Sequence, residues 1–406
     1  MAATRKPMPT AVVVLPSTTY RAADFVTAAE ALGVGLIVAS EGPAPIDMGD
    51  GYLQIDCTDP VLAAETIVAF GDRVGIDGVV AADDAGVVVA AITGQTLGLR
   101  SNTPEAAAAT RDKASQRRAL AAAEVPQPTF AVIGPGDDPV PEATAIGYPL
   151  VIKPLDRAAG QGVMRVDGVE DLLPRLERLR RIVGESAQVI IESYMPGVEV
   201  AVEGIVSDGA LTVLAIFDKP DAGKGPFFPE TILVTPSRLP AATTDECERV
   251  AQVALDAIGI THGPVHIELM VNGAQVRVIE VAARSIGGLC SKSLNFGLMG
   301  TTLETLILRN ALGMDKPELH RESVASGVLM IPIPKQGRFV ELRNTDVVRQ
   351  LPFVTGMDIT VRPGRFLEPP PEGDRYLGFV YARAATPNDV ETSLRKAEHL
   401  LEVVVE

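Results

Sequence analysis

Residues 264–284 read PVHIELMVNGAQVRVIEVAAR, and this stretch constrains the fold more than any other part of the chain. Two apolar runs flank an Asn-Gly pair at 272–273, which is typical of the turn in a β-hairpin. The pattern therefore predicts a first strand from residue 264 and a second strand over residues 275–281. Because side chains alternate between the two faces of a strand, His266 and Glu268 share one face.

The second strand carries its own polar face. Glu280, Ala282 and, if the chain stays extended, Arg284 point to one side. A two-residue Asn-Gly loop would place Glu280 on the face opposite to Glu268, whereas a loop of three or five residues would place them on the same face. With three loop residues, His266 pairs with Glu280 and Glu268 lies diagonal to it, roughly 7 Å away.

Charged side chains on one face of this apolar hairpin need an explanation. Buried charge is costly unless it is paired or bound to a metal. Mg²⁺ prefers oxygen ligands, and one or two carboxylates together with nucleotide phosphates often bind it. Glu268 and Glu280 are therefore candidate metal ligands, with Arg284 nearby. The alternative is a solvent-facing strand side with a salt bridge, and the hairpin alone leaves both interpretations open.

Lysines form a second set of candidates. Lys153 ends an apolar strand, and the small-residue loop 158–163 follows it with Gly160 and Gly162. Backbone N–H groups in such a loop can approach phosphate oxygens closely, and an ammonium group nearby neutralises their charge. Lys113 lies in an Ala-rich stretch that is expected to be helical. Taken alone, Lys113 fits an ordinary surface lysine better.

A third candidate segment is IIESYMPGVEVAVE, residues 190–203. Glu199 and Glu203 lie on one face of the strand that it predicts. An extended backbone followed by a turn can present N–H and C=O groups to an adenine edge, and a nearby carboxylate can accept hydrogen bonds from ribose hydroxyls. Without the other segments, an edge strand with a polar face explains this pattern better.

Composition excludes several classes of protein. The chain has 406 residues, of which 47% are hydrophobic and 22% charged, so we expect a globular protein of two or three subdomains. A net charge of −16 makes nucleic acids and anionic membrane surfaces poor partners. The apolar run at 11–15 is too short to span a bilayer. Three widely separated cysteines indicate free thiols, and we expect a cytoplasmic location.

The order of the expected elements indicates an α/β fold. Strands and helices alternate over residues 10–100, which predicts a small parallel sheet, and no GxGxxG motif follows its first strand. A helical stretch is expected over 103–124. Mixed strands and helices follow, and short strands punctuated by Gly and Pro precede a closing helix at 387–401.

In this order the segments resemble the ATP-grasp superfamily. The match consists of Asp-Lys in a helical stretch, a strand ending Lys-Pro before a glycine loop, Glu-x-Tyr-Met-x-Gly-x-Glu, and a hairpin ending Glu-x-x-x-Arg. It covers residues 100–310 closely. The implied organisation is an N-terminal βαβ domain (1–100), an ATP-grasp domain (101–318) with a nucleotide-binding lid at about 128–195, and a small β-rich α+β domain (319–406).

The resemblance implies ATP and Mg²⁺ (or Mn²⁺) as cofactors, and it assigns a role to each candidate residue. Arg284 would stabilise the charge on the transferred phosphoryl group, and Lys219 with the 223–230 loop would close over the substrate. The remaining assignments are Lys113, Lys153, Gly160 and Gly162 at the ATP phosphates, Glu192, Tyr194 and Met195 at adenine, Glu199 at ribose, and Glu268 and Glu280 at the metal.

One position departs from the family pattern. Many members have Asn where Ala282 stands, and alanine offers no ligand atom for a second metal ion. Glu-x-Ala-Ala-Arg followed by two glycines is similar to the L-amino-acid ligase branch. The resemblance implies a cytoplasmic, ADP-forming ligase that joins a small carboxylate to an amine through an acyl phosphate, with a homodimer as a candidate assembly. The alternatives are activation of formate or bicarbonate, and an ATP-binding module without catalysis.

Overall fold

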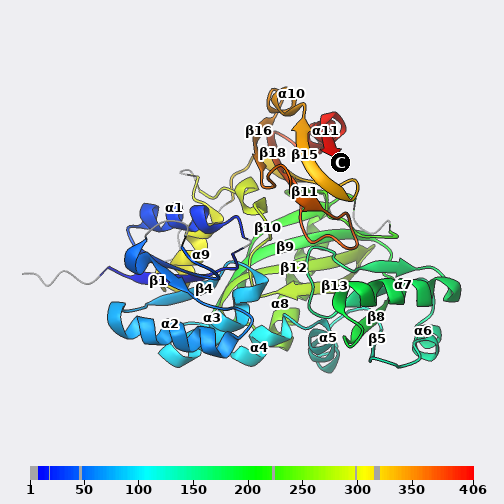
Figure 1. The fold of residues 1–406 in the computed structure, drawn as a ribbon, viewed down its shortest axis with the longest axis horizontal. Helices are drawn as coiled ribbons and strands as arrows, with labels where there is room; N and C mark the ends of the chain where they lie inside the picture. The colour runs from blue at the N-terminus through cyan, green and yellow to red at the C-terminus, as the bar shows by residue number, and fades with distance from the viewer. Residues whose placement is uncertain (1–7, 18, 45–47, 222–224, 298–299, 315–320) are drawn as a thin grey trace, which may run out of the picture.

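The computed structural model describes residues 8–17, 19–44, 48–221, 225–297, 300–314 and 321–406. Strands and helices are mixed along this part of the chain, so the predicted α/β fold class is confirmed (Figure 1). None of the described helices combines the length and apolar character that crossing a bilayer requires.

The N-terminal part forms the predicted parallel sheet. Its elements are β1 (Thr10–Val14), α1 (Ala22–Leu32), β2 (Gly35–Ser40), η1 (Gly49–Gly51), β3 (Tyr52–Gln54), α2 (Pro60–Val74), β4 (Gly78–Ala81), η2 (Asp84–Gly86) and α3 (Val87–Leu97). The strand order is β3-β2-β1-β4, and every pairing is parallel. Val13 faces the core that contains Phe25 of α1, whereas Val12 faces the core that contains Ile67 of α2, so helices cover both faces.

A second, antiparallel sheet is formed by residues 130–193, which we call the lid; its role in nucleotide binding stays a prediction. Its elements are β5 (Phe130–Ile133), α6 (Val140–Ile146), β6 (Leu150–Pro154), β7 (Met164–Val166), α7 (Val169–Val183) and β8 (Val189–Ser193), with strand order β5-β8-β6-β7. Leucines at 172, 176 and 179 of α7 pack against Ile152 and Ile191 of the strands. The lid is drawn in green on the right of Figure 1, with its own small core.

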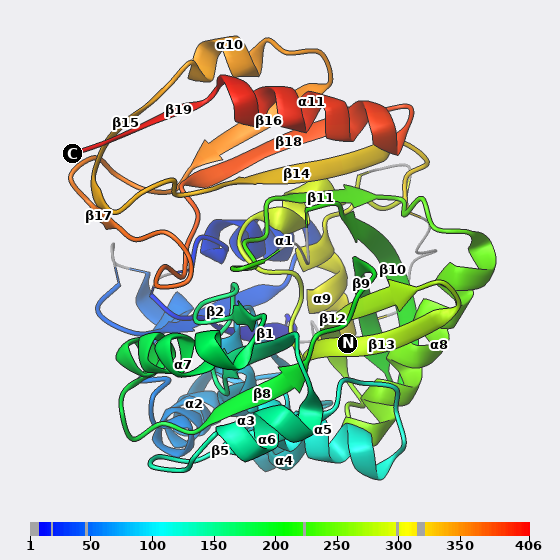
Figure 2. The ribbon, with the colours of Figure 1, turned by 90° about the vertical axis from the view of Figure 1, so that its right-hand side faces the viewer.

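An eight-stranded sheet joins the middle of the chain to its C-terminal part. Its order is β13-β12-β9-β10-β11-β14-β18-β16, and Figure 2 shows the C-terminal elements above the central ones. The elements are β9 (Val198–Ser207), β10 (Ala210–Lys219), β11 (Ile232–Thr235), α8 (Ala241–Ile258), β12 (Gly263–Asn272), β13 (Gln275–Ala282), η3 (Cys290–Ser293), α9 (Leu303–Ala311), β14 (Ala325–Ile331), β16 (Val354–Ile359) and β18 (Gly378–Ala384).

The remaining C-terminal elements cover the end of this sheet. They are β15 (Gly337–Arg343), α10 (Thr345–Arg349), β17 (Phe366–Leu367), α11 (Pro387–Leu400) and β19 (Glu402–Val405), and the strands form a sheet of order β17-β15-β19. Val390 and Leu394 of α11 pack onto the core around β14 and β18. The Gly- and Pro-rich turns noted in the sequence connect these short elements.

The helical stretch expected over 103–124 is interrupted. It contains two helices, α4 (Pro104–Ala109) and α5 (Lys113–Ala122). The carboxylate of Asp112 accepts a hydrogen bond from the backbone N–H of Ser115 at 2.6 Å, and this N-cap starts the second helix. Lys113 therefore begins a helix instead of lying inside a continuous one, and it is held at the cavity described below.

Strands β12 and β13 form the predicted β-hairpin. Asn272 pairs with Gln275, so the turn residues are 273–274 instead of the expected Asn-Gly pair. A two-residue turn in a regular hairpin would leave Glu268 and Glu280 on opposite faces. The turn alone therefore does not explain how these carboxylates meet.

A β-bulge brings the two carboxylates to one face. The register shifts between Glu268 and Leu269, after which Glu268 pairs directly with Glu280, and His266 pairs with Ala282. A bulge inserts one extra residue into one strand, which moves all later side chains to the other face. The diagonal arrangement that a three-residue loop would give, with His266 opposite Glu280, is therefore not formed, and the two glutamates pair directly.

Candidate active site

A cavity of about 610 Å³ lies between the lid, the eight-stranded sheet, the N-terminal sheet and the C-terminal part. Of the twelve residues that the sequence predicted for the site, eleven line this cavity, and Gly162 is the exception. The eleven are Lys113, Lys153, Gly160, Glu192, Tyr194, Met195, Glu199, Lys219, Glu268, Glu280 and Arg284.

Lys113 connects the hairpin to the lid. Its ammonium group lies 3.0 Å from a carboxylate oxygen of Glu280 and donates a 2.7 Å hydrogen bond to the carbonyl oxygen of Arg157. The side chains of Lys113 and Glu280 are 11% and 29% exposed, so this pair is partly open to the cavity. The first predicted phosphate-binding lysine and the second predicted metal ligand therefore lie in direct contact.

Lys153 is held by a buried ion-pair network. Glu192 accepts from the Arg117 guanidinium at 2.6 Å and lies 2.7 Å from the Lys153 ammonium. Burial opposes the charge of Glu192, but Arg117 and Lys153 outweigh it and lower the pKa of this carboxyl to about 2. The carboxylate of Glu192 therefore orients Lys153, which leaves the adenine role of this residue a prediction.

Arg117 is a site residue that the sequence analysis missed. It also donates at 2.6 Å to the carbonyl oxygen of Ile279 on β13, so it joins α5, the lid and the hairpin. The signal was its position four residues after Lys113 in the helical pattern, which puts both side chains on one helix face. An arginine in a helix gives no hint of burial by itself.

The glycine loop after β6 has the backbone shape expected of a close approach. Ala159, Gly160 and Gly162 all have positive φ, at 53°, 70° and 74°. A Cβ atom on Gly160 would meet the carbonyl oxygen of Phe228 at 2.8 Å. Glycine is therefore required at 160 by both conformation and space.

The same loop contacts the C-terminal part. The N–H of Gly162 donates to the carbonyl oxygen of Pro371 at 2.8 Å, and Gln161 donates to the carbonyl oxygen of Glu372 at 2.8 Å. Arg178 of α7 forms two bonds to the Glu372 carboxylate, at 2.6 and 2.9 Å. These bonds to Pro371 and Glu372 hold the lid against the C-terminal part of the chain, and together the two parts partly enclose the cavity.

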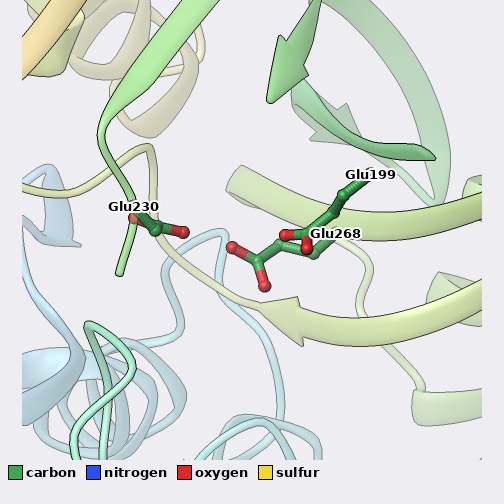
Figure 3. A group of neighbouring side chains, drawn as sticks. All are labelled: Glu199, Glu230 and Glu268. Carbon is green, nitrogen blue, oxygen red and sulfur yellow. The ribbon is translucent and has the colours of Figure 1, made fainter. Parts of the chain in front are cut away.

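Three carboxylates surround Lys219. Glu199, Glu230 and Glu268 each bring an oxygen within 4.8 Å of the others, and Figure 3 shows the three carboxylates pointing toward one another. The Lys219 ammonium pairs with Glu199, lies 2.6 Å from Glu230 and lies 2.8 Å from Glu268. Lys219 is buried and supplies the cation that this acidic group requires. Part of the predicted 223–230 loop lies outside the described residues.

One ammonium cannot neutralise three carboxylates, and the pKa values reflect this. Burial and the neighbouring carboxylates raise the pKa of Glu199 to about 7, and they also raise that of Glu230. Burial opposes ionisation of Glu268, but Lys219 and His266 hold its pKa well below its usual value. The surrounding carboxylates outweigh the effect of burial on Lys219 and raise its pKa well above the usual value.

His266 is a second residue that the sequence analysis did not assign. Its Nδ1 lies 3.0 Å from the carboxylate of Glu203, which is fully buried and accepts from the N–H of Ile286 at 3.0 Å. Burial lowers the pKa of His266, but the hydrogen bond to Glu203 and the Glu268 carboxylate 3.8 Å away outweigh this effect and raise the pKa to about 9. His266 lies beside Glu268 on the same face of β12, as the alternation of side chains predicts.

Arg284 is anchored by the N-terminal part of the chain. Its guanidinium forms two bonds to the Asp84 carboxylate, at 3.0 and 3.1 Å, and Arg111 lies 3.4 Å from the other oxygen. Burial would lower the pKa of Arg284, but the charges of Asp84 and Asp83 outweigh it and raise the pKa further. Asp84 follows the last strand of the parallel sheet, so that sheet contributes directly to the site.

Three family models match successive parts of the chain. They are the ATP-grasp N-terminal domain over residues 26–100, the ATP-grasp domain over residues 146–293, and the L-amino acid ligase C-terminal domain 2 over residues 329–406. The chain belongs to the ATP-grasp family. The C-terminal match also confirms the resemblance to the L-amino-acid ligase branch.

Solved ATP-grasp structures share the whole fold. An L-amino acid ligase from Bacillus licheniformis is 23% identical, with a TM-score of 0.81 over 99% of this chain and 100% of that one. An N5-carboxyaminoimidazole ribonucleotide synthetase from Thermotoga maritima is 14% identical, with a TM-score of 0.73 over 98% and 100%. The predicted ATP-grasp fold, with flanking N-terminal and C-terminal parts, is therefore confirmed.

Two curated relatives match this chain over different shares of their own length. Alanine–anticapsin ligase of Bacillus subtilis is 26% identical over 246 residues, which cover 55% of this chain and 51% of the relative. The chain thus spans about half the length of this relative. An uncharacterized protein of Sinorhizobium fredii is 23% identical over 398 residues, 95% of this chain and 81% of that one. At the level of the family, the expected class of ATP-dependent ligases is confirmed.

Proposed function

We propose that this ATP-grasp protein is an ADP-forming carboxylate–amine ligase with an amino-acid substrate. The observation that carries the proposal is the direct pairing of Glu268 and Glu280 on one face of the hairpin, beside Lys113, in the cavity that Arg284 and Lys153 also line. This arrangement combines the groups that bring two anions together and stabilise the charge that moves between them.

The residues present fit a divalent cation with oxygen ligands. Glu268 and Glu280 would hold Mg²⁺, or Mn²⁺, in contact with the nucleotide phosphates. Bound there, the cation would offset the charge of the phosphates and polarise the transferred phosphoryl group. Ala282 offers no side-chain ligand, so a second cation would rely on water or phosphate oxygens.

The nucleotide would lie between the lid and the hairpin. Lys113 and Lys153 would bind phosphate oxygens, and the 158–163 loop would cover them. We further propose that the backbone around Tyr194 and Met195 binds adenine and that Glu199 binds ribose. Glu192 would support this segment through its ion pair with Lys153. These assignments agree with the cavity lining but rest on the family resemblance for their detail.

The proposed chemistry has two steps. A substrate carboxylate attacks the γ-phosphate, which gives an acyl phosphate and ADP, while Arg284 stabilises the developing charge. An amine then attacks the acyl carbon, phosphate leaves, and an amide forms. The contacts of the lid with Pro371 and Glu372 would exclude water from the acyl phosphate.

A second candidate function is activation of formate or bicarbonate by the same fold. The similarity to N5-carboxyaminoimidazole ribonucleotide synthetases supports it, since these proteins share the architecture along their whole length. Arg284 lines the cavity and is held there by two bonds to Asp84. This disfavours a module that binds ATP without catalysis, because nucleotide binding alone does not need a cation at this place. The cytoplasmic location and the homodimer stay predictions.

The proposal is tested by measuring ADP release while amino acids are supplied in pairs, with mass spectrometry of the products. We expect ADP, phosphate and an amide, and we expect Glu280→Gln to reduce turnover at least a hundredfold with the fold intact. Glu248→Gln, at an exposed position of α8, is the matched control. Release of AMP and pyrophosphate, or unchanged turnover in Glu280→Gln, would contradict the proposal.

A further inference from the structure

Three aromatic side chains line one part of the cavity wall. The ring of Phe379 packs edge to face against Tyr20 and Tyr376, with centroids 6.5 and 6.3 Å away. Tyr20 comes from the N-terminal part and the other two rings from the C-terminal part. Apolar side chains continue this wall, namely Leu233, Ile286 and Met330. The wall offers an apolar surface to one part of a bound substrate.

The hydroxyl group of Tyr376 is a polar atom in this apolar wall. It is buried, and it has no hydrogen-bond partner among the residues that the structure describes. Burial, followed by the charge of Glu230, raises the pKa of Tyr376 well above its usual value, so the group stays a neutral O–H. An unpaired buried hydroxyl is costly, and a ligand group that donates to its oxygen would reduce this cost.

Glu230 is the carboxylate of the acidic group that is most open to the cavity. Its side chain is 27% exposed, compared with 12% for Glu199 and 18% for Glu268. Lys219 donates to one oxygen of the Glu230 carboxylate, and Glu230 is not one of the proposed metal ligands. A carboxylate offers several acceptor positions, so Glu230 can accept a hydrogen bond from a further cation in the cavity.

We propose that Glu230 and the Tyr376 hydroxyl bind the ammonium group of an α-amino acid whose apolar side chain lies against Tyr20 and Phe379. An ammonium group has three donors, and the carboxylate and the neutral phenol oxygen each accept one. The neighbouring aromatic faces also attract a cation. This inference rests on the proposed ligase function, and it specifies the substrate as an amino acid with a free amino group and an apolar side chain.

The test compares two probes with the same carbon skeleton. L-Leucine carries the ammonium group, and 4-methylpentanoate lacks it. Binding to the full chain is measured by calorimetry with Mg²⁺ and a non-hydrolysable ATP analogue. We expect L-leucine to bind at least tenfold more tightly, because a hydrogen bond to a charged group contributes about that factor or more. Tyr376→Phe and Glu230→Gln should each remove about tenfold of the L-leucine affinity and leave that of 4-methylpentanoate unchanged.

Tyr381→Phe is the matched control. The Tyr381 hydroxyl already donates to Asp358 at 3.0 Å, and this residue does not line the cavity, so its loss should leave both affinities unchanged. Equal binding of the two probes, no detectable binding of L-leucine, or an equal effect of Tyr376→Phe on both probes would overturn the inference.

Turnover separates this inference from the proposed function. If 4-methylpentanoate and L-leucine support ADP release equally well with L-alanine as the amine, the ligase activity stands and the ammonium site is wrong. If no pair of carboxylate and amine supports ADP release, the ligase proposal fails. The difference in binding between the two probes would still show whether the ammonium site exists.

Discussion

Replacement of Glu192 by glutamine tests the buried network that holds Lys153. The side chains of Glu192 and Arg117 are both 2% exposed, and that of Lys153 is 10% exposed. Glutamine keeps the size of the side chain but leaves two cations without a counter-charge. Removing one partner of a buried ion pair typically costs about 3–5 kcal/mol.

The shift in pKa gives an independent magnitude. The pKa of Glu192 falls from its usual 4.5 to about 2, and each unit corresponds to about 1.4 kcal/mol, so ionisation of this group stabilises the fold by about 3 kcal/mol. A carboxyl with a lowered pKa stabilises the fold above its unfolded pKa. This contribution is lost as the pH falls from about 4.5 through about 2.

The assay is urea unfolding of wild type and Glu192→Gln at pH 7 and at pH 4. We expect a loss of about 3 kcal/mol at pH 7, a smaller difference at pH 4, and a weaker affinity for ATP. Glu177→Gln is the control, because its ion pair with Arg181 is exposed and should contribute less than about 1 kcal/mol. A loss in Glu192→Gln below about 1 kcal/mol at pH 7 would refute the reasoning.

Two further substitutions test other parts of the site. Gly160→Ala should raise the KM for ATP about tenfold, since the added Cβ meets the carbonyl oxygen of Phe228 and a positive φ costs about 1–2 kcal/mol. The control is Gly136→Ala, because Gly136 also has a positive φ but has open space around it, and this substitution should leave the KM unchanged. Lys219→Met should destabilise the fold by about 3–5 kcal/mol. The loss should grow between pH 6 and pH 8, as the Glu199 carboxyl with its raised pKa ionises. A loss that is independent of pH would contradict this account of the acidic group.

Much of the fold follows from local patterns in the sequence. Helices α1 and α7, Ala22–Leu32 and Val169–Val183, each have a periodic apolar face, which is a local signal for a helix. Asp59 caps α2 and accepts from the N–H of Leu62 at 3.1 Å, and Asp followed by Pro is a local signal for a helix start. These signals lie within one element, so a single sequence suffices to find them.

The shared face of Glu268 and Glu280 could be predicted only as one of several outcomes. It depends on a bulge whose position is set by pairing with neighbouring strands, and no residue at the bulge is a glycine. A short strand, β11, was also missed, although Ile232 to Thr235 are fully buried in the eight-stranded sheet. Contacts between distant strands decide both features, and they have no local sequence signature.

The partners of the predicted residues were the hardest to foresee. Lys113 and Lys153 were identified as candidates, but Arg117 and Glu230 were not, because their roles depend on burial beside groups far along the chain. Asp84 was overlooked because the parallel sheet carries no recognisable motif, and only the fold brings it to Arg284. Motif order therefore identified candidate residues that line the cavity, whereas the groups that contact them could be found only from the structure.

The central claim is that the two paired glutamates hold the cation that binds the nucleotide. A crystal structure with Mn²⁺ and a non-hydrolysable ATP analogue tests it, since anomalous scattering locates the metal. The account predicts a peak bonded to carboxylate oxygens of both Glu268 and Glu280 and to phosphate oxygens. A peak confined to Glu199, Glu230 and Glu268, or a nucleotide bound away from Lys113, would contradict it.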